Sequence, residues 1–490
     1  MRKFLWVVAV GFLVLAMAAP AMALDFKFGA EYRVRFYDGT NVPNGFPAAL
    51  VAAGQNFGTN PRGVQLRLRP RFDVSDDNGN ITATWRAEIG DVEFGNGGGA
   101  SGPANSGFAT LAPGGARVGN GAGGSIGVDG VNVETKWAFV DFALPFDIPA
   151  RVRAGLQAFY LPKGIIVDDD AAGVRAYGKI APVSYELAWY RVNGGPNLNP
   201  GTPPAGSAGM TATSNLLDNN YDFYGGKIDV AFAPWLNPGV YYFFGDNRVN
   251  CSTVLTTCPS RVRENHYVGI TATGKIGIVS YDLDGVFGSA EGGPTGAFGN
   301  PAGIGGAVAN PITTKGFTLD GAVHFPIGPV TVNLTGSYSS GDRDNGGNGE
   351  AFPTIAPSWN GAGGAYEIIG SGGPFDAIEF TQEAPTNLWM LGGWLEYRPV
   401  KALWLKLAYG YAGFTRKSGN CANSLVPATC FGPVYNSLAG KSGLGHELSF
   451  RADWDLWTGF KLQGQVGWLF TPADSNSTAG EYVLQMLYNF

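Results

Sequence analysis

The chain alternates between apolar and polar positions over most of its length, and the segment 481–490 shows this pattern most plainly. Side chains of a strand point alternately to its two faces, so a period of two gives one apolar face and one polar face. The apolar positions of this segment are Tyr482, Leu484, Met486, Tyr488 and Phe490. An apolar face ending in an aromatic residue is typical of the closing strand of an outer-membrane barrel, with lipid outside and water inside.

The same alternation predicts further strands along the whole chain. The predicted strands cover 25–37, 63–74, 80–94, 131–144, 150–160, 173–180, 183–192, 220–233, 237–247, 263–275, 277–288, 316–325, 329–340, 387–398, 402–413, 444–456, 459–471 and 481–490. This gives roughly eighteen strands, and an even number is expected for a single-chain barrel. The predicted fold class is therefore all-β, a transmembrane up-and-down antiparallel barrel.

The predicted connections alternate between short and long. Short turns such as 75–79, 145–149 and 326–328 are separated by long segments such as 95–130 and 341–386. Short periplasmic turns and long extracellular loops distinguish barrels of this class, whereas a soluble repeat protein would not sort its loops by length in this way. Glycine-rich stretches such as 95–124 are interpreted as loops, because no helical pattern follows them to hold a nucleotide phosphate.

The first 23 residues predict a cleaved signal peptide. Arg2 and Lys3 precede an apolar run from Phe4 to Ala19, and 21–23 read Ala-Met-Ala, a typical cleavage site. A membrane anchor is the alternative, but the apolar run is short for a spanning helix. The expected domains are a signal peptide at 1–23 and one barrel at 24–490.

Composition and charge narrow the class of protein. The chain has 75 glycines among 490 residues, 13% aromatic residues and only 15% charged residues, which favours a strand-rich exported protein over a helical enzyme. The net charge of −6 argues against nucleic acid as a partner, since such proteins need a basic surface.

The four cysteines form two close pairs, Cys251 with Cys258 and Cys421 with Cys430. Both pairs fall in predicted extracellular loops, where two local disulfides are the simplest interpretation. Metal binding is the alternative, although neither pair has the usual spacing or a nearby histidine. No haem-attachment motif is present, and no cofactor is expected.

Several motifs stand out in the last third of the chain. They are the residues 340–344 (Ser-Gly-Asp-Arg-Asp), Phe352-Pro353, the run 443–448 leading to Asp453 and Asp455, the strand end 469–472, and Phe490. Together they resemble the alginate-export family of outer-membrane porins. The resemblance implies an eighteen-stranded barrel in the outer membrane. Every predicted periplasmic turn is short here, so we expect an open diffusion channel rather than regulated polysaccharide export. Whether a loop such as 341–386 folds into the pore stays open.

Arginines dominate the polar face of the first six predicted strands. The predicted pore-lining basic residues are Arg33, Arg35, Arg67, Arg69, Arg71, Arg86, Arg153 and Arg175. These charges either pair with carboxylates across strands and keep the lumen hydrated, or remain partly unpaired and concentrate anions. Later strands carry a mixed and slightly acidic polar face.

The sequence gives little support for catalysis, and the predicted protein is not an enzyme. His266, His324 and His446 lie on separate strands, and no nucleophile-elbow or zinc-protease motif occurs. A hydrolase with a triad assembled in space is the residual alternative. The segment 168–170 (Asp-Asp-Asp) is expected at the outer rim, as a solvated loop or a divalent-cation site.

These features together predict a passive outer-membrane porin for small hydrophilic, anionic solutes. One alternative is a substrate-specific channel for acidic oligosaccharides, and another is a barrel that houses a periplasmic redox or secretion partner. The expected partners are outer-membrane lipid and lipopolysaccharide, and the barrel-assembly machinery, which would bind the C-terminal strand.

Overall fold

A computed structural model of the protein describes twelve stretches of the chain. They are residues 24–41, 62–94, 133–194, 220–247, 262–292, 313–341, 349–355, 359, 366–368, 386–416, 442–470 and 478–490. The predicted signal peptide and the four cysteines lie outside the described residues, so both remain predictions.

The described residues form an 18-stranded antiparallel sheet and one short 3₁₀ helix. The strands are β1 (Leu24–Thr40), β2 (Arg62–Asp76), β3 (Ile81–Glu93), β4 (Val133–Ala143), β5 (Ala150–Tyr160), β6 (Asp168–Ile180), β7 (Val183–Gly194), β8 (Asn220–Val230), β9 (Asn237–Asn247), β10 (Val262–Ile276), β11 (Val279–Gly292), β12 (Thr313–Ile327), β13 (Val330–Ser339), β14 (Leu388–Val400), β15 (Leu403–Phe414), β16 (Gly443–Trp457), β17 (Phe460–Phe470) and β18 (Thr478–Asn489). The helix η1 (Pro162–Gly164) lies between β5 and β6.

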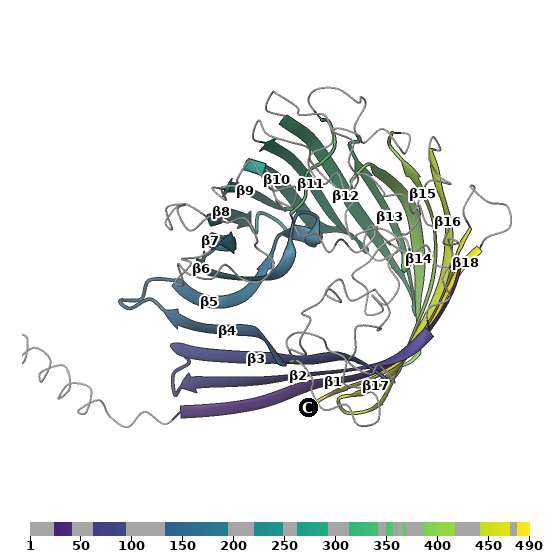
Figure 1. Cartoon of the computed structure of the whole chain (residues 1–490), viewed down its shortest axis with the longest axis horizontal. Coiled ribbons are helices and arrows are strands. Elements are labelled where there is room, and N and C mark those ends of the chain that lie inside the picture. Colours follow the sequence, from purple (N-terminus) through teal and green to yellow (C-terminus); the bar gives the residue numbers. More distant parts are fainter. Residues whose placement is uncertain are drawn as a thin grey trace, which may run out of the picture.

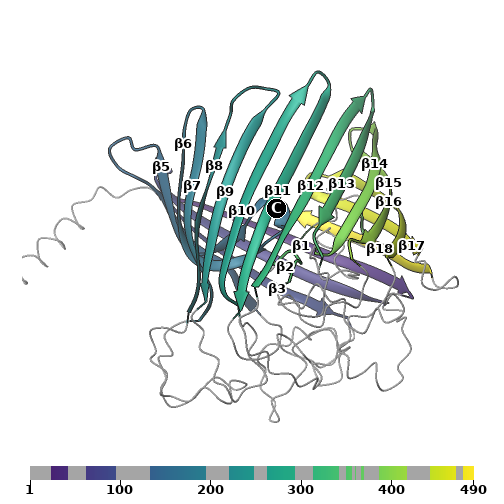
Figure 2. The ribbon, with the colours of Figure 1, turned by 90° about the horizontal axis from the view of Figure 1, so that it is seen from above.

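The sheet closes into a barrel because its first and last strands pair. β1 pairs with β2 on one side and with β18 on the other, and Tyr32 lies opposite Tyr488 across the seam. The backbones of Ala30 and Phe490 exchange two hydrogen bonds of 2.9 and 3.1 Å beside this pairing. Figure 1 shows the strands following one another around the ring, and Figure 2 shows β5 to β13 side by side. Closure gives each of the eighteen described strands a neighbour on both sides.

The predicted all-β barrel is confirmed, and each of the predicted strands overlaps an observed one. The largest difference is at β6, which begins at Asp168 rather than at residue 173. The Asp168–Asp170 segment is therefore part of a strand, and the prediction of a rim loop was wrong. Asp170 accepts a hydrogen bond from Trp137 Nε1 at 2.7 Å and pairs with Lys136 at 2.8 Å. The strand extends to Asp168 because residues 168–170 pair with residues 158–160 of β5.

The two faces of the sheet differ in chemistry as the alternation predicts. Large apolar side chains are exposed on the outer face, and Ile270, Leu391 and Trp454 retain half or more of their accessible surface. The opposite face carries the arginines and carboxylates, so polar groups fill the inside of the closed barrel. Such a belt of apolar side chains around a polar interior suits a lipid bilayer. Among the described residues, no helix is long and apolar enough to cross a membrane.

Short turns join the strands at one end of the barrel. β10 ends at Ile276 and β11 begins at Val279, and Gly277 between them has φ +62°. An added Cβ atom on Gly277 would meet open space, so crowding does not require glycine at this position. The left-handed backbone conformation is what requires it.

Candidate functional site

The predicted basic residues all lie on the polar face of the first six strands. Arg33 and Arg35 come from β1, Arg67, Arg69 and Arg71 from β2, Arg86 from β3, Arg153 from β5 and Arg175 from β6. Their neighbours along each strand carry the exposed apolar side chains, so the arginines point into the barrel. We call this set, with Arg151, the arginine wall. Arg35 is almost fully buried and donates to the Gln65 side chain.

At the centre of the arginine wall, one carboxylate forms ion pairs with three arginines. Glu31 lies 3.0 Å from Arg67, 3.7 Å from Arg69 and 3.8 Å from Arg86, measured between the nearest charged atoms. Arg69 also pairs with Glu88. The Arg86 guanidinium lies 4.7 Å from the centre of the Trp137 ring, a cation–π distance. Three cations therefore converge on a single negative charge.

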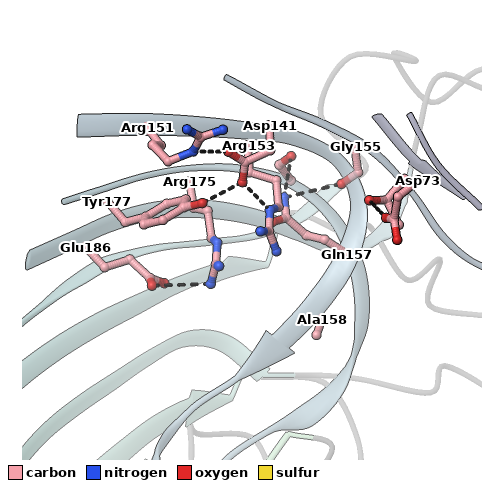
Figure 3. Close-up of polar contacts among 12 residues, drawn as sticks. Asp73, Asp141, Arg151, Arg153, Gly155, Gln157, Ala158, Arg175, Tyr177 and Glu186 are labelled. Atoms are coloured by element: carbon pink, nitrogen blue, oxygen red, sulfur yellow. Dashed lines mark hydrogen bonds and ion pairs between the residues drawn. The ribbon is translucent and has the colours of Figure 1, made fainter. Parts of the chain in front are cut away.

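A second shared carboxylate, Asp141 on β4, contacts two arginines of β5, as Figure 3 shows. Asp141 accepts from Arg151 Nε at 2.6 Å, from Arg153 Nε at 2.8 Å and from the Tyr177 hydroxyl at 2.5 Å. Arg175 pairs separately with Glu186 at 3.4 Å. The sequence prediction omitted Arg151, although its odd-numbered position on β5 places it on the same face as Arg153.

Cross-strand pairing and an excess of positive charge thus coexist in the wall. Each shared carboxylate offsets one unit of charge, yet it contacts two or three guanidiniums. Glu31 and Asp141 therefore each meet more positive charge than one carboxylate can offset, and this favours a positive field on this side of the lumen.

The segment between β5 and β6 folds into the barrel rather than over its rim. Figure 1 shows this blue segment inside the ring of strands. Leu161, Ile165, Ile166 and Val167 flank η1 and are at most 3% exposed. They pack with aromatic side chains of the inner face, among them Phe159, Tyr241 and Phe243. Burial of this apolar segment narrows the lumen.

Lys163 ties this segment to the wall formed by β11 and β12. Its Nζ atom lies 2.7 Å from Asp282 and 2.6 Å from Asp320, whose side chain is fully buried. Burial opposes the charge on Lys163, but the two carboxylates outweigh burial and raise the pKa of its ammonium above the ordinary value. Lys163 is therefore charged at neutral pH. We call this contact the Lys163 latch.

A second inward segment, between β13 and β14, meets the first. The Ile355 backbone N–H donates to the Ile166 carbonyl at 3.0 Å, and Trp359 Nε1 donates to Asp320 at 3.2 Å. Asp320 thus accepts from Lys163 on one inward segment and from Trp359 on the other. The question left open by the sequence is answered: described parts of 341–386 do fold inward.

The same segment is seated further along on glycines of the lumen face. The Tyr366 hydroxyl oxygen lies 2.9 Å from the backbone carbonyl oxygen of Leu391 and 2.9 Å from that of Tyr411, and the two carbonyls share its single proton as acceptors. Its ring lies against Gly410, where an added Cβ atom would come within 2.3 Å of it. Next to it, Glu367 pairs with Lys406 at 2.6 Å. Two described loop segments and the strands therefore build a constriction inside the barrel.

The sequence contained one signal for this constriction. The run 161–167 reads Leu-Pro-Lys-Gly-Ile-Ile-Val, which is too apolar for an extracellular loop exposed to water. No such signal marks Trp359 or Tyr366, whose partners lie far away in the chain.

The histidines do not form a reactive site. His324 contacts Asp282 at 3.0 Å and Asn333 at 2.6 Å, both on neighbouring strands of the inner face. His266 and His446 lie on the outer face beside Tyr242 and Tyr409. Within the described stretches, no group of three or more histidine, cysteine or acidic side chains could hold a metal ion.

Comparison with known proteins rests on structure. None of the family models searched matches the chain, and no curated protein matches it. The structure is similar to that of OccK8 (OprE) from Pseudomonas aeruginosa, with a TM-score of 0.51, 12% identity and coverage of 95% of this chain and 98% of that chain. OpdK from the same species, solved with vanillate, gives a TM-score of 0.51 at 11% identity, with the same coverage.

A third similar structure is OccAB4 from Acinetobacter baumannii, with a TM-score of 0.50, 11% identity and coverage of 96% of this chain and 99% of that chain. Such low identities establish the fold alone, and they do not confirm the resemblance to the alginate-export family. The chain therefore has the barrel fold of these outer-membrane proteins.

Proposed function

We propose that the protein is an outer-membrane porin through which small hydrophilic anions diffuse passively. The arginine wall carries this proposal, because Glu31 and Asp141 are each shared by more than one arginine. A lumen lined in this way attracts anions and offers guanidinium forks to carboxylates. OpdK was solved with vanillate, an aromatic carboxylate, which agrees with a solute of this class.

The constriction favours small solutes over polymers. The two inward segments meet at Asp320 inside the barrel and reduce the cross-section open to an acidic oligosaccharide. An oligosaccharide channel, which the alginate-export resemblance suggests, remains the second candidate and requires the Lys163 latch to open. A sheath around a periplasmic partner is less compatible with these segments, since they take the place of a partner.

The surroundings of the barrel follow from this proposal. Its apolar belt would contact outer-membrane lipid and lipopolysaccharide. The β18 strand, which ends beside Phe490, would be the segment presented to the barrel-assembly machinery. No catalytic role or cofactor is proposed.

The proposal is tested by the reversal potential of the refolded barrel in a planar bilayer under a salt gradient. We expect anion preference, reduced several-fold in the triple variant R67Q/R69Q/R71Q, because three cations leave the lumen. The matched control is D73N/E88Q/E186Q, which removes three carboxylates from the same region and should increase the preference. Cation preference in the unmodified barrel, or unchanged selectivity in the arginine variant, would refute the proposal.

A further inference from the structure

A separate pocket of about 180 Å³ lies outside the arginine wall. It is set in the inner face of β14 to β17, next to the short turns that join β14 to β15 and β16 to β17. Its lining residues are Arg398, Lys401, Trp404, Arg451, Asp453, Asp455 and Lys461. Four cations face two carboxylates, although this half of the barrel is otherwise mixed in charge.

One of the two carboxylates is already saturated. Asp453 accepts from Arg451 Nε at 2.8 Å and from Arg451 Nη2 at 2.9 Å. Gln463 Nε2 donates to the same carboxylate at 2.9 Å. Lys461 lies 3.6 Å from Asp455 and 4.0 Å from Asp453, so it is only loosely paired. Asp453 therefore orients Arg451 and has little capacity to neutralise a second cation.

Arg398 and Lys401 supply the charge that remains. Both side chains are exposed, and among the described residues neither makes a side-chain hydrogen bond or ion pair. The nearby carboxylate of Glu396 is occupied by other donors, since it accepts from Trp394 Nε1 at 2.8 Å and from Trp404 Nε1 at 3.1 Å. The N–H groups of the Arg398 and Lys401 side chains are therefore available to bind a ligand.

Trp404 is a lining residue of the pocket whose ring is held in place by its neighbours. Its Nε1–H is held by Glu396, and the Arg451 guanidinium lies 5.3 Å from the centre of its ring. Arg451 is thus held by a bidentate carboxylate and by an aromatic ring at the same time. A preorganised guanidinium loses little entropy when it binds an anion.

We propose that this pocket binds a small dianion, a dicarboxylate or a phosphate, at the short-turn mouth of the barrel. Arg398 and Lys401 contact the ligand directly, and Arg451 supplies the fixed donor between them and Trp404. The inference rests on the proposed function, because it adds a binding step to the passage of anions. It differs from the arginine wall in being a discrete concave site rather than an extended surface.

The first test is calorimetric titration of the detergent-solubilised barrel with succinate and, separately, with hydrogenphosphate. In the variant R398Q/K401Q we expect binding to weaken about tenfold, equivalent to about 1.4 kcal/mol. The matched control K179Q/K275Q removes two exposed lysines next to other short turns and should leave binding within about twofold. Tighter binding of succinate would identify the ligand as a dicarboxylate, and tighter binding of hydrogenphosphate would identify it as a phosphate.

Equal weakening of binding in both variants would refute the proposed site, because the positive charge of the rim as a whole would then explain binding. Unchanged binding in R398Q/K401Q would overturn it as well. Neither side chain has a described partner, so their loss leaves the fold intact.

A second measurement separates this inference from the proposed function. Succinate added on the short-turn side of a bilayer should block current, and R398Q/K401Q should remove the block. Loss of succinate binding in that variant supports the pocket even where the reversal potential shows no anion preference and the porin proposal fails. Anion preference with succinate binding unchanged in the variant supports the porin and refutes the pocket.

Discussion

Asp320 is the residue on which the interior of the barrel converges. Its side chain is fully buried, and it accepts from Lys163 and Trp359, which lie on two different inward segments. A buried carboxylate without partners is costly, so the segments and Asp320 stabilise one another. One side chain on β12 thus couples two segments separated by about two hundred residues in the chain.

We predict that D320N loosens the constriction. Removing one partner of a buried ion pair costs about 3 kcal/mol, which corresponds to about a hundredfold shift between closed and open constriction. The open probability in single-channel recordings should therefore rise. The control D229N breaks an exposed pair with Lys227 and should leave the open probability unchanged. Identical gating in D320N and the unmodified barrel would contradict the role of Asp320.

The raised pKa of Lys163 predicts how the latch depends on pH. Because the pKa of Lys163 is raised, its charged form stabilises the latch. This stabilisation is complete at any pH below the ordinary lysine pKa of about 10.4. That stabilisation is lost as the pH rises through the higher pKa of the folded protein. Open probability should thus be flat from neutral pH to about 10 and rise above it. K163R should remain latched at the same alkaline pH, and opening already between pH 7 and 9 would refute the assignment.

At the scale of elements, glycines of the lumen face decide where the inward segments sit. The Tyr366 ring occupies the space above Gly410, and Phe352 lies close to Gly316 and Gly288. Strand glycines weaken a sheet, but here they let a loop approach the backbone. The constriction therefore depends on the strands as much as on the loops.

G410A tests this seat. The added Cβ atom would lie 2.3 Å from the Tyr366 ring, so the ring must move and lose its bonds to Leu391 and Tyr411. Overpacking of this kind costs about 1–3 kcal/mol, measurable as a lower free energy of unfolding in guanidinium. G464A is the matched control, because open space surrounds that position on β17. Equal unfolding free energies for the two variants would show that Tyr366 is not held there.

The strands could be predicted and the constriction could not, for a physical reason. Period-two alternation is a local signal that lipid outside and water inside impose on every strand, so Tyr482 to Phe490 and Phe26 to Phe36 reveal it directly. The inward fold depends on contacts such as Lys163 with Asp320, 157 residues apart, which no local pattern encodes. Only the apolar run 161–167 hinted at it. The excess of arginine was visible, but the sharing of Glu31 and Asp141 required the register of neighbouring strands.

At the scale of the whole molecule, charge is distributed unevenly around the lumen. The arginine wall extends over β1 to β6, while β11 and β12 contribute Asp282, Asp284 and Asp320. Lys163 neutralises part of that acidic side from within. In the proposed porin, a solute would cross a field directed from one wall to the other, and an anion would follow the arginines.

Ionic strength separates this field from contact selectivity at the constriction. The screening length falls from about 10 Å at 0.1 M salt to about 3 Å at 1 M, so the field of exposed arginines across a wide lumen is screened. We expect the ratio of anion to cation permeability to fall roughly threefold over this range and approach unity. Reversal potentials at a fixed tenfold gradient and rising mean salt measure it. Contacts within about 3 Å, such as Lys163 with Asp320, escape this screening because they are buried. If the ratio of anion to cation permeability stays constant up to 1 M salt, selectivity therefore arises at the constriction and not at the arginine wall.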